Sequence, residues 1–110
     1  MSESRFEWEG PPELLPTVTE ALERVVDPEV ALNIVDVGLV YGVTVEDQRI
    51  DVHVTMTSAA CPVADVIVSD IEIELDRALP EGMLIHVELV WEPPWTPERM
   101  SDTARLFMGW

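Results

Sequence analysis

The chain has 110 residues, enough for one domain that buries roughly two-thirds of the surface its unfolded form would expose. It carries 22 acidic residues against 6 basic ones, and the formal net charge of −16 argues against binding to nucleic acid or to anionic membranes. The hydrophobic content of 47% fits a folded core, and no apolar run reaches the ~20 residues that span a bilayer.

The first thirteen residues predict a flexible N-terminal arm, because Ser, Glu, Gly and a Pro-Pro pair dominate them. Phe6 and Trp8 are the exceptions, and we expect them to dock onto the domain's own surface, with contact to a partner as the alternative. No secretory signal is visible, and the chain holds a single cysteine, so we expect a reducing cytoplasm. Residues 14–110 then form one domain.

The first half of this domain predicts one helix and a β-hairpin. Apolar residues recur at helical spacing from Pro16 to Val26, and Pro28 ends the helix. Residues 30–38 then form a connector. Two β-rich runs, 39–46 and 49–56, are joined by Asp-Gln, and the second alternates clearly, with Ile50, Val52, Val54 and Met56 on one face.

The second half predicts a long helix, a third strand and a short last helix. One apolar stripe runs from Pro62 to Leu79, and residues 83–91 alternate as a strand. Thr96 or Ser101 caps the last helix, which ends at Gly109. The element order α-β-β-α-β-α predicts an α+β fold, a small mixed sheet of about three strands with helices packed on one face.

Cys61 is the residue with the most chemical potential, because it lies where a strand end meets the start of a helix. Pro62 is a favoured first residue of a helix, and the amides and dipole at a helix N-terminus stabilise a thiolate. The alternative is a small buried side chain, since free cysteines often only pack. The sequence leaves both interpretations open.

Several polar residues are candidates to support this thiol. The hydroxyls of Thr55, Thr57 and Ser58 precede it, although hydroxyls at such a junction also cap backbone amides. The chain after the first helix supplies three carboxylates, Asp27, Glu29 and Asp36, which are by default turn and cap residues. We expect His53 and His86 to be exposed strand residues, so that a Cys-His hydrolase is disfavoured.

Trp91 and Trp95 flank two prolines in the segment EPPW. Stiff prolines and amphipathic indoles make either a lid over the core or an anchor for a protein interface, and both roles are compatible.

Three segments in order resemble the small metal–sulfur cluster assembly factors of the SufT and PaaD type, whose eukaryotic relatives act in cytosolic iron–sulfur protein assembly. They are VVDPEVALNIVDVGLVYGVTVE, VTMTSAACPVADVI and VELVWEPPWTPERMSDTAR, and the likeness runs from about Thr17 to the end of the chain. The family's DPE falls on residues 27–29, its N-I-V-D-x-G-L-V-Y on residues 33–41, and its T-x-x-x-C-P on Thr57, Cys61 and Pro62.

The resemblance implies a non-enzymatic factor that matures client iron–sulfur apoproteins together with other assembly proteins. Cys61 is then the cluster or sulfur ligand, supported by Asp27, Glu29, Asp36, Thr57 and Ser58, with Trp91 and Trp95 at an interface. The cofactor is at most a transient iron–sulfur cluster, since stable clusters typically need about four protein ligands, and one thiol per chain can share a cluster across a homodimer.

Two other roles stay open at this stage. The chain ends at Trp110 without the cysteine-rich extension of the phenylacetate-pathway members, which favours a stand-alone factor over a PaaD-like accessory of a ring-hydroxylating oxygenase. A protein-interaction adaptor, in which Cys61 only packs, is the other alternative. A thiol enzyme ranks last.

Overall fold

A computed structural model describes residues 6–57 and 61–109, and for residues 61–63 it describes the backbone alone. With η for a 3-10 helix, the elements follow in this order: β1 (Glu7–Glu9), η1 (Pro12–Leu14), α1 (Leu15–Glu23), β2 (Val26–Asp27), β3 (Leu32–Asn33), α2 (Ile34–Val37), β4 (Val40–Glu46), β5 (Arg49–Val54), α3 (Cys61–Ala78), β6 (Leu84–Leu89), η2 (Pro97–Arg99) and α4 (Asp102–Met108). All six predicted elements are present, and the α+β class is confirmed.

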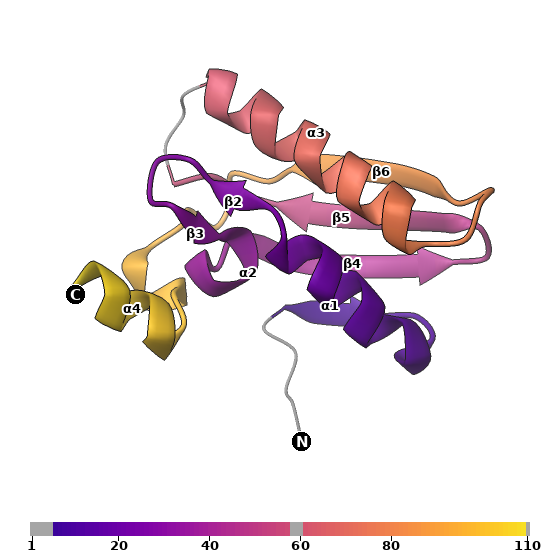
Figure 1. Cartoon of the computed structure of the whole chain (residues 1–110), viewed down its shortest axis with the longest axis horizontal. Helices are drawn as coiled ribbons and strands as arrows, with labels where there is room; N and C mark the ends of the chain where they lie inside the picture. The colour runs from indigo at the N-terminus through magenta and orange to yellow at the C-terminus, as the bar shows by residue number, and fades with distance from the viewer. Residues whose placement is uncertain (1–5, 58–60, 110) are drawn as a thin grey trace.

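The main sheet has four strands in the order β1-β4-β5-β6, where about three were predicted (Figure 1). The β4–β5 hairpin is antiparallel, whereas β1 pairs with β4 and β6 pairs with β5 in parallel, so the sheet is mixed as expected. The additional strand, β1, lies within the segment predicted to be a flexible arm. Its three residues, Glu-Trp-Glu, are too few to give a periodic signal, and they directly follow Phe6, which is buried in the core.

The two longer helices cover one face of this sheet (Figure 1). Ile50, Val52 and Val54 of β5 are fully buried on that face, while Asp51 and His53 point to the other, so the predicted alternation is confirmed. From α3, the buried apolar residues Ile67, Ile71 and Leu75 pack onto it. The opposite face carries no helix among the described residues, and we call it the open face.

The helix boundaries lie close to those predicted from periodicity. The long helix spans Cys61–Ala78 instead of residues 62–79. The first helix spans Leu15–Glu23 and stops short of Val26, because the chain leaves it to form β2. At the other end Ser101 caps α4 by accepting the Ala104 N–H, and Gly109 closes it in a left-handed conformation, as expected.

Residues 26–37, which include most of the predicted connector, form a compact structural unit. β2 and β3 form an antiparallel two-stranded ribbon, and α2 is a single helical turn directly after it. These elements are two to four residues long, below the length at which periodicity is informative. The β2 strand of the ribbon lies next to α3.

The N-terminal aromatic residues and the character of the helices were also predicted. Phe6 is buried and Trp8 packs against the core, so both dock onto the domain as expected. Among the helices of the described ranges, none has the length and apolar character that crossing a membrane requires.

Candidate functional site

Cys61 is the first residue of α3, an 18-residue helix, and so lies at the positive end of its dipole. The predicted strand-to-helix junction is therefore present in the backbone. The side chain of Cys61 and all of Ser58 lie outside what the structure describes. The described side chains at this junction are those of Thr57 and of the residues that it contacts.

Thr57 connects this junction to the DPE segment. Its hydroxyl lies 3.3 Å from Oδ2 of Asp27 and 3.3 Å from Oε1 of Glu29, within donating distance of both. Thr57 precedes Cys61 by four residues, whereas Asp27 lies 30 residues before Thr57. We call Asp27, Glu29 and Thr57 the Thr57 cluster.

Asp27 is the buried member of the cluster. Its residue is 0% exposed, and its Oδ1 accepts the Glu29 N–H at 2.9 Å in a turn that Pro28 and the following residues close. A buried carboxylate needs partners to offset the loss of hydration. Here these are the Glu29 N–H and the Thr57 hydroxyl. Asp27 therefore presents a fixed acceptor to the Thr57 hydroxyl.

Asp36, the remaining predicted support residue, has a different role. Asn33 caps α2 by accepting the Asp36 N–H at 2.8 Å, and its amide donates back to Oδ2 of Asp36, also at 2.8 Å. The Asp36 carbonyl accepts the Ser101 N–H at 2.7 Å. The structure thus brings Asp27, Glu29 and Thr57 together and uses Asp36 to hold α2 and α4. The Asn-x-x-Asp spacing is the signal that predicts such a cap.

Thr55 is buried in another way. It is 1% exposed, and its hydroxyl has no partner among the described residues. Its N–H donates to the Leu39 carbonyl at 2.8 Å, which ties the end of β5 to the segment after α2.

The two tryptophans lie in different environments. Trp95 is half-buried and donates its Nε1–H to the Val37 carbonyl at 2.8 Å, so it acts as a lid on α2. Trp91 is 47% exposed. Tyr41 and Arg99, which sequence reasoning did not single out, complete this region: the Tyr41 hydroxyl donates to the Pro93 carbonyl, and the Arg99 guanidinium stacks 4.2 Å from the Tyr41 ring centre.

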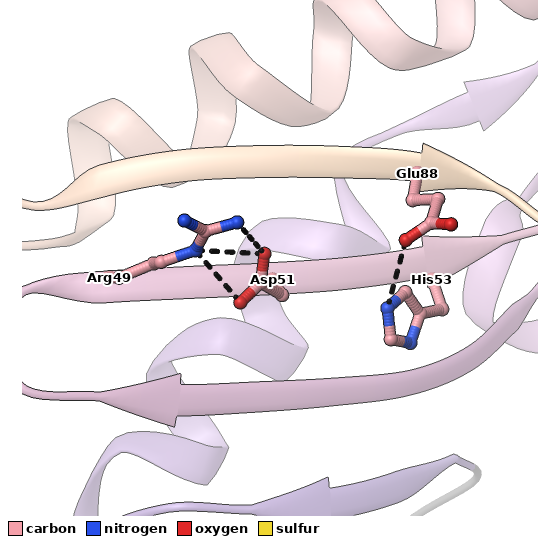
Figure 2. A network of polar contacts seen from close by, with 4 residues as sticks. All are labelled: Arg49, Asp51, His53 and Glu88. Atoms are coloured by element: carbon pink, nitrogen blue, oxygen red, sulfur yellow. Dashed lines mark hydrogen bonds and ion pairs between the residues drawn. The ribbon is translucent and has the colours of Figure 1, made fainter.

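His53 and His86 lie on the open face and are not directly opposite one another. The register pairs His53 with Glu88 and Asp51 with His86, and Nε2 of His53 lies 3.4 Å from Oε1 of Glu88 (Figure 2). Arg49 donates to Asp51, and this hydrogen bond lowers the pKa of Asp51. Among the described residues no three His, Cys, Asp or Glu side chains converge to hold a metal ion.

The sequence and the fold of this chain were compared with those of known proteins. A model of the iron–sulfur cluster assembly protein family matches residues 16–88, which includes the Thr57 cluster and Cys61. The chain is 44% identical to the Fe-S protein maturation auxiliary factor YitW of Bacillus subtilis, over 81% of this chain and 87% of that protein. It is 40% identical to the Fe-S protein maturation auxiliary factor SufT of Staphylococcus aureus, over 77% of this chain and 97% of that protein.

A solved structure of a domain of unknown function from Bacillus anthracis is similar in fold. It superposes with a TM-score of 0.80 at 43% identity, over 86% of this chain and 90% of that one. Sequence and fold therefore agree, and the chain belongs to the family of iron–sulfur cluster assembly proteins.

Proposed function

We propose that this protein is a maturation factor for iron–sulfur proteins, and that Cys61 binds the cluster or its sulfur during delivery. The names of the Bacillus subtilis and Staphylococcus aureus relatives support the role, because the chain spans most of both proteins. The cluster is then the cargo of the protein and not a resident cofactor.

The observation that carries the proposal is the bridge from Thr57 to Asp27 and Glu29, four residues before Cys61. It attaches Thr57 to the β2–β3 ribbon, and in this proposal that attachment helps to set where α3 begins. At that point the helix N-terminus stabilises a thiolate, the soft ligand that iron–sulfur clusters prefer. The Thr57 cluster positions the thiol in this account and does not itself ligate iron.

In this proposal the protein holds the iron–sulfur cluster only weakly, because Cys61 is its one cysteine ligand. Clusters are typically held by about four protein ligands, and this chain has a single cysteine. Ligands from a client apoprotein or from another assembly protein would complete the coordination. In this proposal the protein transfers a preformed cluster without catalysing a reaction, and it works in the cytoplasm with such partners.

The test is cluster assembly and transfer under anaerobic conditions. The wild type, Cys61→Ser and Thr57→Val are incubated with ferrous iron, sulfide and thiol reductant, and charge-transfer absorption is recorded before and after an apo-ferredoxin is added. We expect a band in the wild type that moves to the ferredoxin, no band in Cys61→Ser, and a weakened band in Thr57→Val. Equal bands in the wild type and Cys61→Ser would exclude Cys61 as the ligand.

An adaptor that recruits clients without binding a cluster is a second candidate, favoured by the exposed apolar side chains of Trp91, Leu106 and Phe107. In that case Cys61 only packs, and its thiol resists alkylation in the folded protein. Rapid alkylation of the native protein by iodoacetamide would argue against the adaptor and for a reactive thiol.

A further inference from the structure

The outer edge of β6 is an open strand edge. β6 is the last strand in the order β1-β4-β5-β6, so its far side has no strand neighbour among the described residues. Residues 84–89 contain no proline, no lysine and no bulge, the features by which proteins usually protect an edge. An edge of this kind is a template for pairing with another strand.

The direction of the backbone groups identifies the residues available at this edge. The Leu84 N–H donates to the Gln48 carbonyl at 2.6 Å, and the Val90 N–H donates to the Val54 carbonyl at 2.7 Å. Even-numbered residues of β6 therefore bond to β5, and by alternation the main-chain groups of Ile85, Val87 and Leu89 point outward.

We propose that β6 pairs antiparallel with β6 of a second copy of this chain, around a two-fold axis at Val87. A two-fold interface must be self-complementary, and this register satisfies that condition. It lets Ile85 exchange hydrogen bonds with the partner's Leu89, and Val87 with the partner's Val87. It also places His86 directly opposite the partner's Glu88, on both sides of the axis.

The open face then becomes an alternating row of imidazoles and carboxylates. Within one copy His53 already faces Glu88 (Figure 2). The strand register also pairs Asp51 with His86. Across the seam, Glu88 would next meet the partner's His86, which in turn faces its own Asp51. Shifting the axis to His86 brings two imidazoles together, and shifting it to Glu88 opposes two carboxylates, which is unfavourable across strands.

The helix that covers β6 contributes an apolar rim to the same seam. Val66 and Ile73 of α3 are 49% and 45% exposed, and their spacing of seven residues puts them on one face of the helix. Ile73 lines a groove of about 340 Å³ with Met83 and Ile85. Because α3 runs back along β6, the two-fold axis brings Ile73 of one copy toward the partner's Val66.

Charge opposes this association and gives it a recognisable signature. Each copy carries a formal charge of −16, and Glu72 and Asp76 line the same groove. Salt shortens the range of this repulsion, from about 10 Å at 0.1 M to about 3 Å at 1 M. The dimer should therefore be weak at low salt and tighten severalfold at high salt. An interface held by ion pairs alone would weaken as salt is added.

The test is sedimentation equilibrium of the full chain at low and at 1 M salt, up to about 1 mM protein. His86→Glu places a carboxylate opposite the partner's Glu88 twice and should weaken dimerisation at least about tenfold. His53→Glu is the matched control: it makes the same change on the same face beside Glu88 of its own copy, one strand further from the seam. It should dimerise like the wild type.

Amide hydrogen exchange locates the seam independently of any variant. The N–H groups of Ile85, Val87 and Leu89 should exchange quickly in dilute protein and become protected as the dimer forms. Those of Leu84 and Val90, which already bond to β5, are the internal reference.

Three outcomes would overturn the proposal. A protein that stays monomeric at high salt and high concentration has no such interface. A dimer that His86→Glu and His53→Glu affect equally is not joined at β6. Protection of the three outward amides by an added extended client peptide, with no self-association, would assign the edge to a different occupant. None of these outcomes depends on the cluster chemistry of Cys61.

Discussion

The hydroxyl of Thr57 lies 3.3 Å from the buried carboxylate of Asp27, a residue 30 positions earlier in the chain. This contact ties Thr57, three residues beyond the end of β5, to β2 of the β2–β3 ribbon. Cys61, the first residue of α3, follows Thr57 by four residues.

Replacing Thr57 with valine keeps the shape of the side chain and removes the donor. Oδ2 of Asp27, in a residue that is 0% exposed, then loses its hydroxyl partner. Because an unsatisfied buried acceptor costs about 1–3 kcal/mol, we expect the free energy of unfolding to fall by about that amount. Urea denaturation measures it, and Thr57→Ser, which retains the hydroxyl, should lose less.

Thr44→Val on β4 is the control for this substitution. Thr44 pairs with Asp51 and faces away from the helices, so the same loss of a hydroxyl leaves no buried carboxylate behind. We expect a change within about 0.5 kcal/mol. If Thr57→Val and Thr44→Val were equally stable, the contact with Asp27 would contribute nothing to the fold.

Gly38 is the position where a single methyl group should be most damaging. Its φ is 87°, and a Cβ there would lie 2.2 Å from the carbonyl oxygen of Arg99. Gly38→Ala therefore adds a backbone clash to the left-handed strain of about 1–2 kcal/mol, and should displace η2 and α4. We expect a larger loss in the free energy of unfolding, together with faster amide exchange in α4.

Gly82→Ala separates the two causes. Its φ is 94°, but an added Cβ would meet nothing within 4 Å, so only the left-handed strain remains. We expect this variant to lose about 1–2 kcal/mol and to leave α4 unchanged. A Gly38→Ala variant no less stable than Gly82→Ala would show that η2 does not pack tightly on α2.

The contrast between β5 and α2 shows what the sequence alone can predict of this fold. β5 alternates strictly, and α3 carries a long apolar stripe, so local periodicity determines both. α2 has four residues, too few for a periodic signal, and its end at Gly38 lies against Arg99, a residue far away in the sequence. β1 likewise pairs with β4, a distant segment of the chain.

The candidate site is divided in the same way. Asp27, Glu29 and Thr57 could be selected as polar residues near a thiol, and the family resemblance added their roles. Their mutual contact joins residues up to 30 positions apart, which no local pattern predicts. Asp36 belongs to the same predicted set, but its side chain bonds to Asn33 at the start of α2 and its carbonyl accepts the Ser101 N–H.

Asp51 predicts a pH dependence with a definite sign. The hydrogen bond from Arg49 lowers the pKa of Asp51 from its ordinary value of 3.8, with smaller effects from the charges of Arg49, His86 and His53. A group with a lowered pKa in the folded state stabilises the protein above its unfolded pKa and loses this contribution as the pH falls through the folded value. The contribution should be small, since the Arg49 side chain is 51% exposed.

Arg49→Gln removes the partner, so it should lower stability near neutral pH, and this effect should disappear as the pH falls through the lowered pKa of Asp51 in the folded protein. Urea midpoints between about pH 2.5 and 7 measure the difference from the wild type. In an Asp51→Asn background the same substitution should have an effect that does not change with pH. A pH-dependent difference in that background would mean that another carboxylate is responsible.

The two tryptophans should respond differently to removal of the indole N–H. Trp95→Phe keeps an aromatic ring but leaves the Val37 carbonyl without its 2.8 Å donor, and should lower the free energy of unfolding by about 1 kcal/mol. Trp91→Phe should change it by less than about 0.5 kcal/mol, since Trp91 is 47% exposed. Thermal denaturation measures both. If Trp91 anchors a client, Trp91→Ala should weaken client binding while the folded protein keeps its stability. If Trp91→Ala instead lost as much stability as Trp95→Ala, both indoles would belong to the lid.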